Sequence, residues 1–389
     1  MHASRPLDNL NETKPKVAIQ RCEVYDSDKV FSALKSSIDL LGGIDLFFKR
    51  GERVLLKPNL LVAKPAEAAA TTHPSIVKAA ISLVKEAGAI PIVGDSPGVG
   101  SAIKVARKCG IADLCKEMGV KIIDLKDSVT VLNPNGKTFK RFEVAKEALE
   151  VDAILNLPKA KTHAQMFLTL GIKNLFGCVV GKRKPQWHLS AGIDTNYFAR
   201  MLVDLYLLMR PSLTIVDGII GMEGNGPGSG DPRKLGLIFA SSDCIALDTI
   251  ITMTLGANPE ELPVLKVAAE DGIGETNPCR IAIVGEKIEE CRIGDFRFPE
   301  KVVSTNFSAI FPPFIERRLR KAVASRPRIE HKRCTLCDIC IDTCPPGIMT
   351  KESKIMIEMD SCISCFCCQE MCPHGAITSK RGWLARLIK

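Results

Sequence analysis

The sequence predicts an α/β fold: a mostly parallel sheet with flanking helices, followed by a small C-terminal two-cluster ferredoxin-like domain rich in cysteine. Two observations support this prediction. From about residue 15 to 295, short β-rich apolar runs alternate with helical stretches rich in Ala, Lys, Glu and Leu, and such alternation is typical of parallel sheets. Beyond residue 330 the composition changes, and nine of the sixteen cysteines lie between Cys334 and Cys372.

The individual elements follow from apolar periodicity. SIVKAAISLVKEAG (75–88) has apolar residues at i, i+3 and i+4 spacing and a terminal Gly88, which predicts an amphipathic helix with a C-terminal stop. The clearest predicted strands are RVLLKPN (53–59), AIPIVGDSPG (89–98), DAILNLPK (152–159), SLTIVDG (212–218) and LGLIFASSD (235–243).

The chain divides into four predicted parts. Residues 1–300 form the α/β domain, which is expected to carry an anion-binding crevice. A linker follows at 301–329, where a Pro-Pro break and a basic, helix-like run predict a partly helical segment. The ferredoxin-like domain spans 330–380, and a basic tail occupies 381–389.

Composition and charge restrict the classes of protein to consider. The 389 residues are 46% apolar and 25% charged, as in ordinary globular proteins. The start of the chain has no apolar signal region, and no run of about 18 apolar residues occurs, so we expect a cytoplasmic protein. Only 5% of residues are aromatic, which argues against a nucleic-acid partner. The basic segments favour solvated helices over membrane contact, and the oligomeric state is left open.

Charge is unevenly distributed along the chain. The formal net charge is +9, although residues 330–380 contain five Lys or Arg and seven Asp or Glu. The basic excess therefore belongs to the large domain, where it favours an anionic small molecule or an acidic partner protein.

The cysteines follow a repeated pattern. Cys334-x2-Cys337-x2-Cys340-x3-Cys344-Pro is followed by Cys362-x2-Cys365-x2-Cys368-x3-Cys372-Pro. This is the spacing of bacterial two-cluster ferredoxins, in which the fourth cysteine of each run binds the other cluster. The predicted cofactors are two [4Fe–4S] clusters. Their predicted ligands are Cys334, Cys337, Cys340 and Cys372 for the first and Cys362, Cys365, Cys368 and Cys344 for the second.

Zinc is the alternative for these cysteines. Two zinc sites would use CxxC pairs, without the third cysteine at spacing three or the two Cys-Pro pairs. Cys367, adjacent to Cys368, falls outside the repeat. It is either a small packed residue or a thiol that tunes the nearby ligand sulfurs.

Polar residues close several of the predicted strands. Lys57, Asp95, Asn156 and Asp217 each come at the end of a β-rich run. Ligands of parallel sheets bind outside the carboxyl ends of the strands, so these four residues predict a binding crevice. Asp and Asn also cap helices and begin turns, which is the alternative for each residue taken singly.

A lysine-rich segment follows the third predicted strand. In LNLPKAKTHAQ, Lys159, Lys161 and His163 alternate, so an extended backbone places them on one face. Lys173 and Asn174 follow shortly after. This density of lysines predicts an anion site, and His163 is the best candidate for a general acid or base. Lys161 and Asp217 are the other candidate catalytic residues.

A glycine-rich segment, GMEGNGPGSGDP (221–232), contains five glycines. Glycines permit close backbone approach and expose N–H groups to anions, and Gly226 is the candidate for this role. The segment matches neither a P-loop nor a dinucleotide-binding fingerprint.

Several motifs together resemble a known family. LLKPNLL, TTHP, VGDSPG, LPKAKTHAQ, LGIKNLFG, VDGIIGMEGNGP and SSDCIALD resemble the motifs of the domain-of-unknown-function family 362, and CFCCQEMCPHGAI resembles the ferredoxin module fused to many members. The resemblance implies an α/β domain joined to an iron–sulfur domain and leaves the reaction open. The motif residues that it singles out are Lys57, Asn59, His73, Asp95, Lys159, Lys161, His163, Lys173, Asn174, Asp217, Glu223, Asp243 and Asp248.

Three functions fit these features. The first is a ferredoxin-linked oxidoreductase that relays electrons through two clusters to an anionic substrate or organic cofactor in the α/β domain. The second is an electron carrier or assembly factor that docks a partner redox protein. The third is a ligand-binding protein that responds to redox state. The first is favoured, because a polar crevice is joined covalently to an electron-transfer module.

Overall fold

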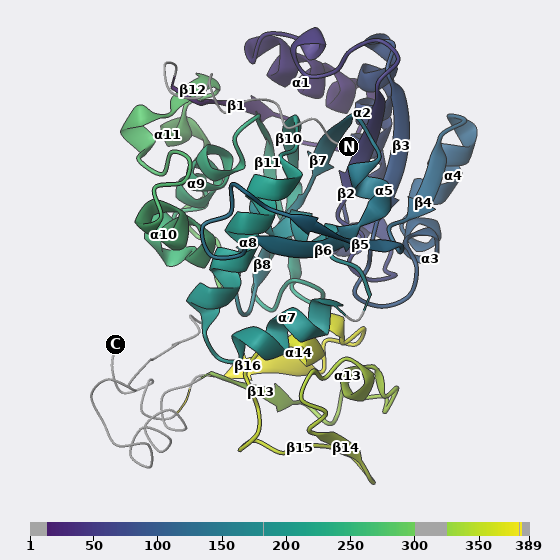
Figure 1. Cartoon of the computed structure of the whole chain (residues 1–389), viewed down its shortest axis with the longest axis vertical. Helices are drawn as coiled ribbons and strands as arrows, with labels where there is room; N and C mark the ends of the chain where they lie inside the picture. The colour runs from purple at the N-terminus through teal and green to yellow at the C-terminus, as the bar shows by residue number, and fades with distance from the viewer. Residues whose placement is uncertain (1–13, 182, 300–324, 381, 383–389) are drawn as a thin grey trace.

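A computed structural model describes residues 14–181, 183–299, 325–380 and 382. It has a large α/β domain and a small cysteine-rich module, which lies at one end of the domain (Figure 1). Most of the predicted linker (301–329) and nearly all of the basic tail (381–389) lie outside the described residues.

A ten-stranded sheet forms the centre of the α/β domain. Its strand order is β12-β1-β11-β10-β7-β2-β3-β4, with β8 pairing with β10 and β9 pairing with β8. The strands are β1 (Lys16–Arg21), β2 (Arg53–Pro58), β3 (Ile90–Asp95), β4 (Lys121–Asp124), β7 (Ala153–Leu157), β8 (Lys159–His163), β9 (Phe167–Thr169), β10 (Leu213–Glu223), β11 (Asp231–Ser241) and β12 (Ala282–Gly285).

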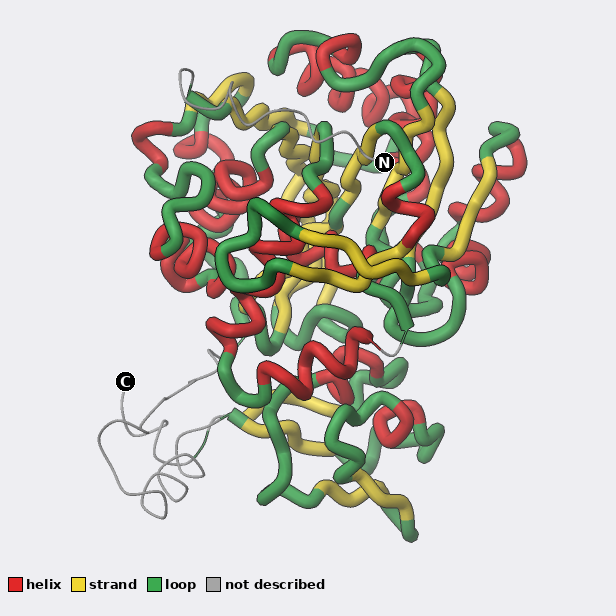
Figure 2. Tube along the Cα trace, viewed as in Figure 1, coloured by secondary structure: helices red, strands yellow, loops and turns green. Residues whose placement is uncertain are grey.

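The prediction of a mostly parallel sheet is confirmed. Strands β4, β3, β2, β7 and β10 are joined by parallel pairings, as are β8 with β10 and β1 with β12. Strand β11 is antiparallel to both neighbours, and β9 is antiparallel to β8. A separate hairpin of β5 (Ser128–Leu132) and β6 (Arg141–Ala145) crosses outside the main sheet (Figure 2).

Helices cover both faces of the sheet (Figures 1 and 2). One core contains residues of the first four helices, and the other contains residues of the later ones. Among the described residues, no helix combines the length and apolar character needed to cross a membrane. The helices of the domain are α1 (Ser27–Leu40), α2 (Pro74–Glu86), α3 (Ala102–Lys108), α4 (Ile111–Glu117), α5 (Lys146–Leu149), α6 (Gly171–Asn174), α7 (Arg183–Ala191), α8 (Thr195–Met209), α9 (Cys244–Thr254), α10 (Pro263–Glu270) and α11 (Ile288–Cys291).

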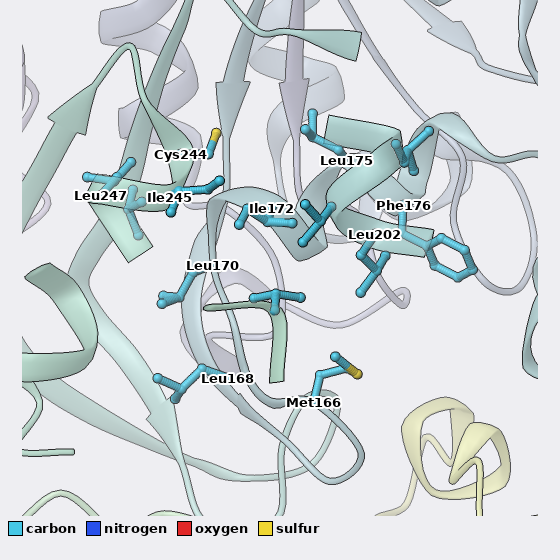
Figure 3. Close-up of a cluster of buried hydrophobic side chains, with 14 of the residues drawn as sticks. Met166, Leu168, Leu170, Ile172, Leu175, Phe176, Leu202, Cys244, Ile245 and Leu247 are labelled. Carbon is cyan, nitrogen blue, oxygen red and sulfur yellow. The ribbon is translucent and has the colours of Figure 1, made fainter. Parts of the chain in front are cut away.

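Strand alternation divides apolar side chains between the two cores. On β2, Val54 and Leu56 enter the core beneath α1 and α2, whereas Leu55 enters the opposite core, as a period of two requires. Figure 3 shows part of that second core, where the segment after β8 packs between α8 and α9. Burial of this apolar surface fixes the ends of β7 and β8, and therefore positions the polar side chains that they carry.

Two of the motif residues begin helices. His73 is the N-cap of α2, and its Nδ1 accepts a hydrogen bond from the backbone N–H of Ser75. Asp243 caps α9 by accepting hydrogen bonds from Ile245 and Ala246. Both caps satisfy N–H groups that would otherwise lack partners at the first turn.

The cysteine-rich module contains two small antiparallel pairs, β13 (Arg326–Ile329) with β16 (Ile377–Lys380) and β14 (Met349–Lys351) with β15 (Ile355–Ile357). Its helices are α13 (Ile339–Asp342) and α14 (Cys367–Met371). The module thus begins at or before residue 326 rather than at 330, because β13 in the expected linker pairs with β16. Among its described residues, one apolar cluster contains six buried residues, two of which are cysteines.

Candidate functional site

Strand β8 carries the three alternating basic residues of the sequence analysis. Lys159, Lys161 and His163 are all buried, and the extended backbone predicted for them is confirmed. The three side chains have different partners: an acidic network, a chain of amides and the cysteine-rich module, respectively. The strand therefore joins three parts of one polar site.

Lys159 belongs to the acidic network. Its Nζ donates to Asp217 Oδ2 at 2.9 Å and to Tyr25 Oη at 2.6 Å. Tyr25 Oη donates to Asp217 Oδ1 at 2.7 Å, and the backbone N–H of His73 donates to Oδ2 at 2.9 Å. Burial lowers the pKa of Lys159, although Asp217 opposes this shift. The ion pair is thus fully hydrogen-bonded, as buried charges require.

The position of Asp217 differs from the sequence-based expectation. It does not close its strand, because β10 continues to Glu223 past an irregularity between Gly218 and Ile220. Asp217 is aligned instead with Lys159, at the point where β10 passes from β7 to β8 as its parallel neighbour. The lysine and the carboxylate therefore meet from adjacent strands inside the sheet.

Tyr25 and His73 extend this network. Their rings stack with centroids 3.6 Å apart. Burial raises the pKa of Tyr25, and the charge of Asp217 adds to the shift. Burial lowers the pKa of His73 to about 4. Both groups are therefore uncharged near neutral pH and act as fixed hydrogen-bonding and stacking partners.

Lys57 and Asp95 form a second buried ion pair. Lys57 Nζ lies 2.7 Å from Asp95 Oδ1, and Asp95 Oδ2 accepts a hydrogen bond from the backbone N–H of Leu60 at 2.8 Å. Gly177 backs this pair so closely that a Cβ there would lie 2.1 Å from Asp95 Oδ1. These two predicted anion-binding residues thus pair with each other, and their charges offset.

A chain of amides leads from Lys161 to Asn156. Lys161 Nζ donates to Asn59 Oδ1 at 2.8 Å, and Asn59 Nδ2 donates to Asn174 Oδ1 at 2.8 Å. Asn174 Nδ2 in turn donates to Asn156 Oδ1 at 2.8 Å. Burial lowers the pKa of Lys161 to about 7, an effect that Glu370 opposes and Lys173 reinforces. Lys161 is therefore a proton donor or acceptor close to neutrality.

His163 faces the cysteine-rich module. Its Nδ1 accepts the backbone N–H groups of Gln165 and Met166, both at 3.2 Å. The neutral ring therefore carries its proton on Nε2. Nε2 lies 3.6 Å from Glu370 Oε2 of α14, which is too long for a normal hydrogen bond. Burial lowers the pKa of His163, and Glu370 opposes that shift.

A further lysine and a second histidine lie near Glu370. Lys173 is buried, and its Nζ lies 4.8 Å from the centroid of the Phe176 ring. His188 of α7 is also buried, and burial lowers its pKa to about 3. Burial alone would raise the pKa of Glu370, but Lys173 and His163 outweigh it and lower that pKa well below its ordinary value.

The glycine-rich segment holds the module against the domain. Gln369 Nε2 donates to Asn225 Oδ1 at 2.7 Å and to the carbonyl of Gly226 at 2.9 Å. The N–H of Gly226 donates to Thr162 Oγ1 at 3.2 Å. A Cβ at Gly228 would lie 2.6 Å from the carbonyl oxygen of Glu370. Close approach at Gly228 is therefore to the backbone of α14, and the N–H of Gly226, for which an anion was predicted, has Thr162 as its partner.

The predicted cluster ligands fall into two groups. Cys334, Cys337, Cys340 and Cys372 line one pocket of the module. For the other set, Cys368 interacts electrostatically with Cys365, Cys362 and Cys344, and also with Cys340 of the first set. Within the described residues, no three His, Cys, Asp or Glu side chains converge on a single metal ion. Four cysteines of a cubane bind separate irons and so need not converge, and this donor set fits two [4Fe–4S] groups.

Cys367 lies on the domain side of the module. It is buried, hydrogen-bonds Cys365 and is close enough to Lys173 for their charges to interact. It therefore lies between a predicted ligand thiolate and the lysine site. The packed-residue and tuning interpretations of Cys367 both fit this position.

Sequence reasoning missed three members of the site: Tyr25, His188 and Glu370. In the sequence, Glu370 lies between two predicted ligands, Cys368 and Cys372. The cysteine pattern therefore gave no reason to assign it a separate role. The local sequence does not indicate a role for Tyr25, which lies 192 residues from Asp217 in the chain.

The fold and site define an α/β protein whose strands carry a buried lysine-rich centre closed by a cysteine-rich module. Residues 54–253 match the Domain of unknown function (DUF362), and the chain belongs to this family. It is also 37% identical over 313 residues to a thylakoid-associated protein of Synechocystis sp., covering 78% of this chain and 97% of the relative.

A more distant similarity is to a solved structure. The lactate racemase apoprotein from Thermoanaerobacterium thermosaccharolyticum is 14% identical, with a TM-score of 0.39. The match covers 60% of this chain and 55% of the racemase chain, so it spans little more than half of that protein.

Proposed function

We propose that this protein is an iron–sulfur oxidoreductase that relays electrons through two [4Fe–4S] clusters to an anionic substrate or organic cofactor in the α/β domain. One observation carries the proposal. Helix α14 contains Cys368, a predicted ligand, and the same helix brings Glu370 to His163. The predicted electron relay and the lysine-rich site thus share one helix.

The exposure of the cysteines supports an order for the relay. Cys337 is exposed, whereas Cys365 and Cys368 are buried. Cys365 also lies close enough to Glu370 for their charges to interact. The group held by Cys334, Cys337, Cys340 and Cys372 would then exchange electrons with a redox partner, and the other would face the substrate site.

The residues of the domain have complementary roles. The clusters, when bound, would supply single electrons at low potential. Lys161 and Lys173 stabilise negative charge on the bound molecule as it is reduced, in surroundings from which water is excluded. His163 holds a proton on Nε2, where it can donate to that molecule. Asp217 fixes Lys159 by the ion pair described above, which is a positioning role.

The proposal is tested by reducing the anaerobically reconstituted protein and following its reoxidation by candidate anionic acceptors. Lys161→Met and His163→Gln are expected to slow reoxidation about 100-fold at unchanged iron content, because each removes a proton donor. Lys266→Met, an exposed lysine of α10, is the matched control. Unchanged rates in both site variants would rule out reduction at this site.

One observation favours the second candidate, an electron carrier or assembly factor. The described site residues are almost completely covered, since Lys161 and His163 expose 0% and 1% of their surface. Electrons would then be exchanged with a partner protein only through the surface of the module near the exposed Cys337. Recovery of one redox partner protein by affinity purification, with no small molecule in native mass spectra, would support this function.

Membrane contact is a separate question raised by the name of the thylakoid-associated relative. The basic segments of this chain, in the expected linker (301–329) and the tail (381–389), lie mostly outside the described residues. We propose that the protein does not bind bilayers by itself. Flotation with vesicles containing anionic lipid tests this, and co-flotation of the full chain would contradict it.

A further inference from the structure

The site around Glu370 has more donors than the protein itself satisfies. His163 exposes 1% of its surface, and its Nε2 has no hydrogen-bond partner among the described residues. His188 exposes 3%, and its Nδ1 is likewise without a partner there. Buried polar atoms without partners are costly. Two such atoms around one carboxylate indicate a place built for a ligand.

The direction of the His163 donor is fixed by the backbone. Because Nδ1 accepts two N–H groups, the proton of the neutral ring is on Nε2 and is directed toward Glu370 Oε2, 3.6 Å away. An acceptor oxygen of a bound molecule placed slightly nearer than Glu370 would make the missing hydrogen bond. Glu370 is therefore an imperfect occupant of this position.

Lys173 supplies the charge for the same position. It is buried, and no hydrogen bond of its Nζ is found within the described residues. Burial lowers the pKa of Lys173, and the charge of Glu370 opposes that shift more than any other group does. The carboxylate of Glu370 thus offsets a buried positive charge that the α/β domain does not neutralise by itself.

We propose that His163, Lys173 and His188 form a carboxylate-binding site of the α/β domain, which Glu370 of the module occupies until a carboxylate of the substrate replaces it. This rests on the proposed function and adds the chemical class of the substrate. One ammonium and one fixed imidazole donor match the single charge and two oxygens of a carboxylate, whereas a phosphate has a larger charge and more acceptor oxygens.

Replacement of Glu370 has a structural consequence. The side chain lies on α14 next to Gln369, which hydrogen-bonds Asn225 and Gly226. A substrate that displaces Glu370 must therefore loosen part of the contact between the module and the glycine-rich segment. Substrate binding would then change the surroundings of Cys368, which lies on the same helix.

Chemical rescue tests the site without any enzymatic assay. In the anaerobic full-length protein with its clusters, Glu370→Ala leaves the three cationic or donor groups without their carboxylate. Sodium formate and sodium acetate are expected to raise the melting temperature of this variant saturably, by roughly 2–4 °C. Sodium chloride at equal ionic strength controls for screening. Should the alanine variant lose iron, Glu370→Ser is measured in its place.

Matched variants identify the groups responsible. Glu370→Gln fills the same volume without charge and is expected to show no rescue. Lys173→Met combined with Glu370→Ala is expected to abolish the effect of acetate. Absence of a saturable shift, or an equal shift with chloride, would show that Glu370 is only a docking residue. A larger shift with phosphate than with acetate would overturn the carboxylate class.

The outcomes separate this proposal from the proposed function. Rescue of melting temperature requires only the binding site, whereas electron relay is measured by cluster reoxidation. Rescue with no reoxidation would support the site and contradict the relay. Reoxidation that depends on His163, with no rescue, would support the relay and overturn the carboxylate site.

Discussion

The interiors of the α/β domain and of the cysteine-rich module contain different kinds of residues. In the domain, two extended apolar cores surround buried lysines, and Lys57 and Lys159 each contact a carboxylate of the same domain. In the described part of the module, one buried cluster has six residues, and cysteines line a pocket. The buried lysines of the domain thus have protein partners, whereas the module would depend on the clusters proposed for its cysteines.

Removal of iron gives the largest expected effect and tests this contrast directly. After anaerobic chelation, amides of residues 326–380 should lose their protection from hydrogen exchange, because few apolar contacts remain there. Amides of β2, β7 and β10 should remain protected. Module amides that keep their protection after the iron is removed would show that the two regions fold by the same means.

Breaking the Lys57–Asp95 pair should have the next largest effect. Asp95→Asn leaves the ammonium of Lys57 buried without a counter-charge, and the free energy of unfolding should fall by about 3–5 kcal/mol in urea titrations. Asp295→Asn is the control, since Asp295 pairs with Arg233 at an exposed position, and it should change stability by less than about 1 kcal/mol. Similar losses for both variants would contradict the prediction.

A smaller loss is expected from Tyr25→Phe. The hydroxyl donates to Asp217 and accepts from Lys159, so its removal leaves buried partners unsatisfied and should lower the free energy of unfolding by about 1–3 kcal/mol. Tyr197→Phe removes a hydroxyl from an exposed side chain and should be nearly neutral. A neutral Tyr25→Phe would mean that the acidic network tolerates its loss.

The pH dependence of stability should show the smallest effect per step, because the change is spread over several pH units. The pKa of Lys161 is lowered from 10.5 to about 7, so between these values the unfolded chain binds more protons than the folded protein. The free energy of unfolding should therefore rise with pH across this window, by up to about 1.4 kcal/mol per pH unit from this group. Lys161→Met should reduce that slope, and identical slopes in both proteins would refute the lowered pKa.

Local sequence patterns were sufficient for the five clearest strands and for the single face of Lys159, Lys161 and His163. These features depend on neighbours a few residues apart, where the backbone period decides the outcome. The sequence also marked Asp217 as a site residue, although it placed that residue at the end of a strand.

The contacts that complete the site could not be predicted in this way. Tyr25 reaches Asp217, and Glu370 reaches His163, only after distant segments have packed together. The alternation rule places a side chain on a face of the sheet but says nothing about what covers that face. For Glu370, the covering element is helix α14, whose Cys368 had already been assigned to metal binding.

The pairing of β13 with β16 brings the two ends of the described module together. A segment whose entry and exit adjoin can be exchanged between proteins without rethreading the host domain. A transplanted module with the same cysteine spacing would carry the proposed iron-binding cysteines. It would place no carboxylate near His163 unless its own helix matched α14. A transplanted module would therefore have to match the domain at one five-residue helix. This requirement, rather than the metal ligands, would restrict the exchange of modules in evolution.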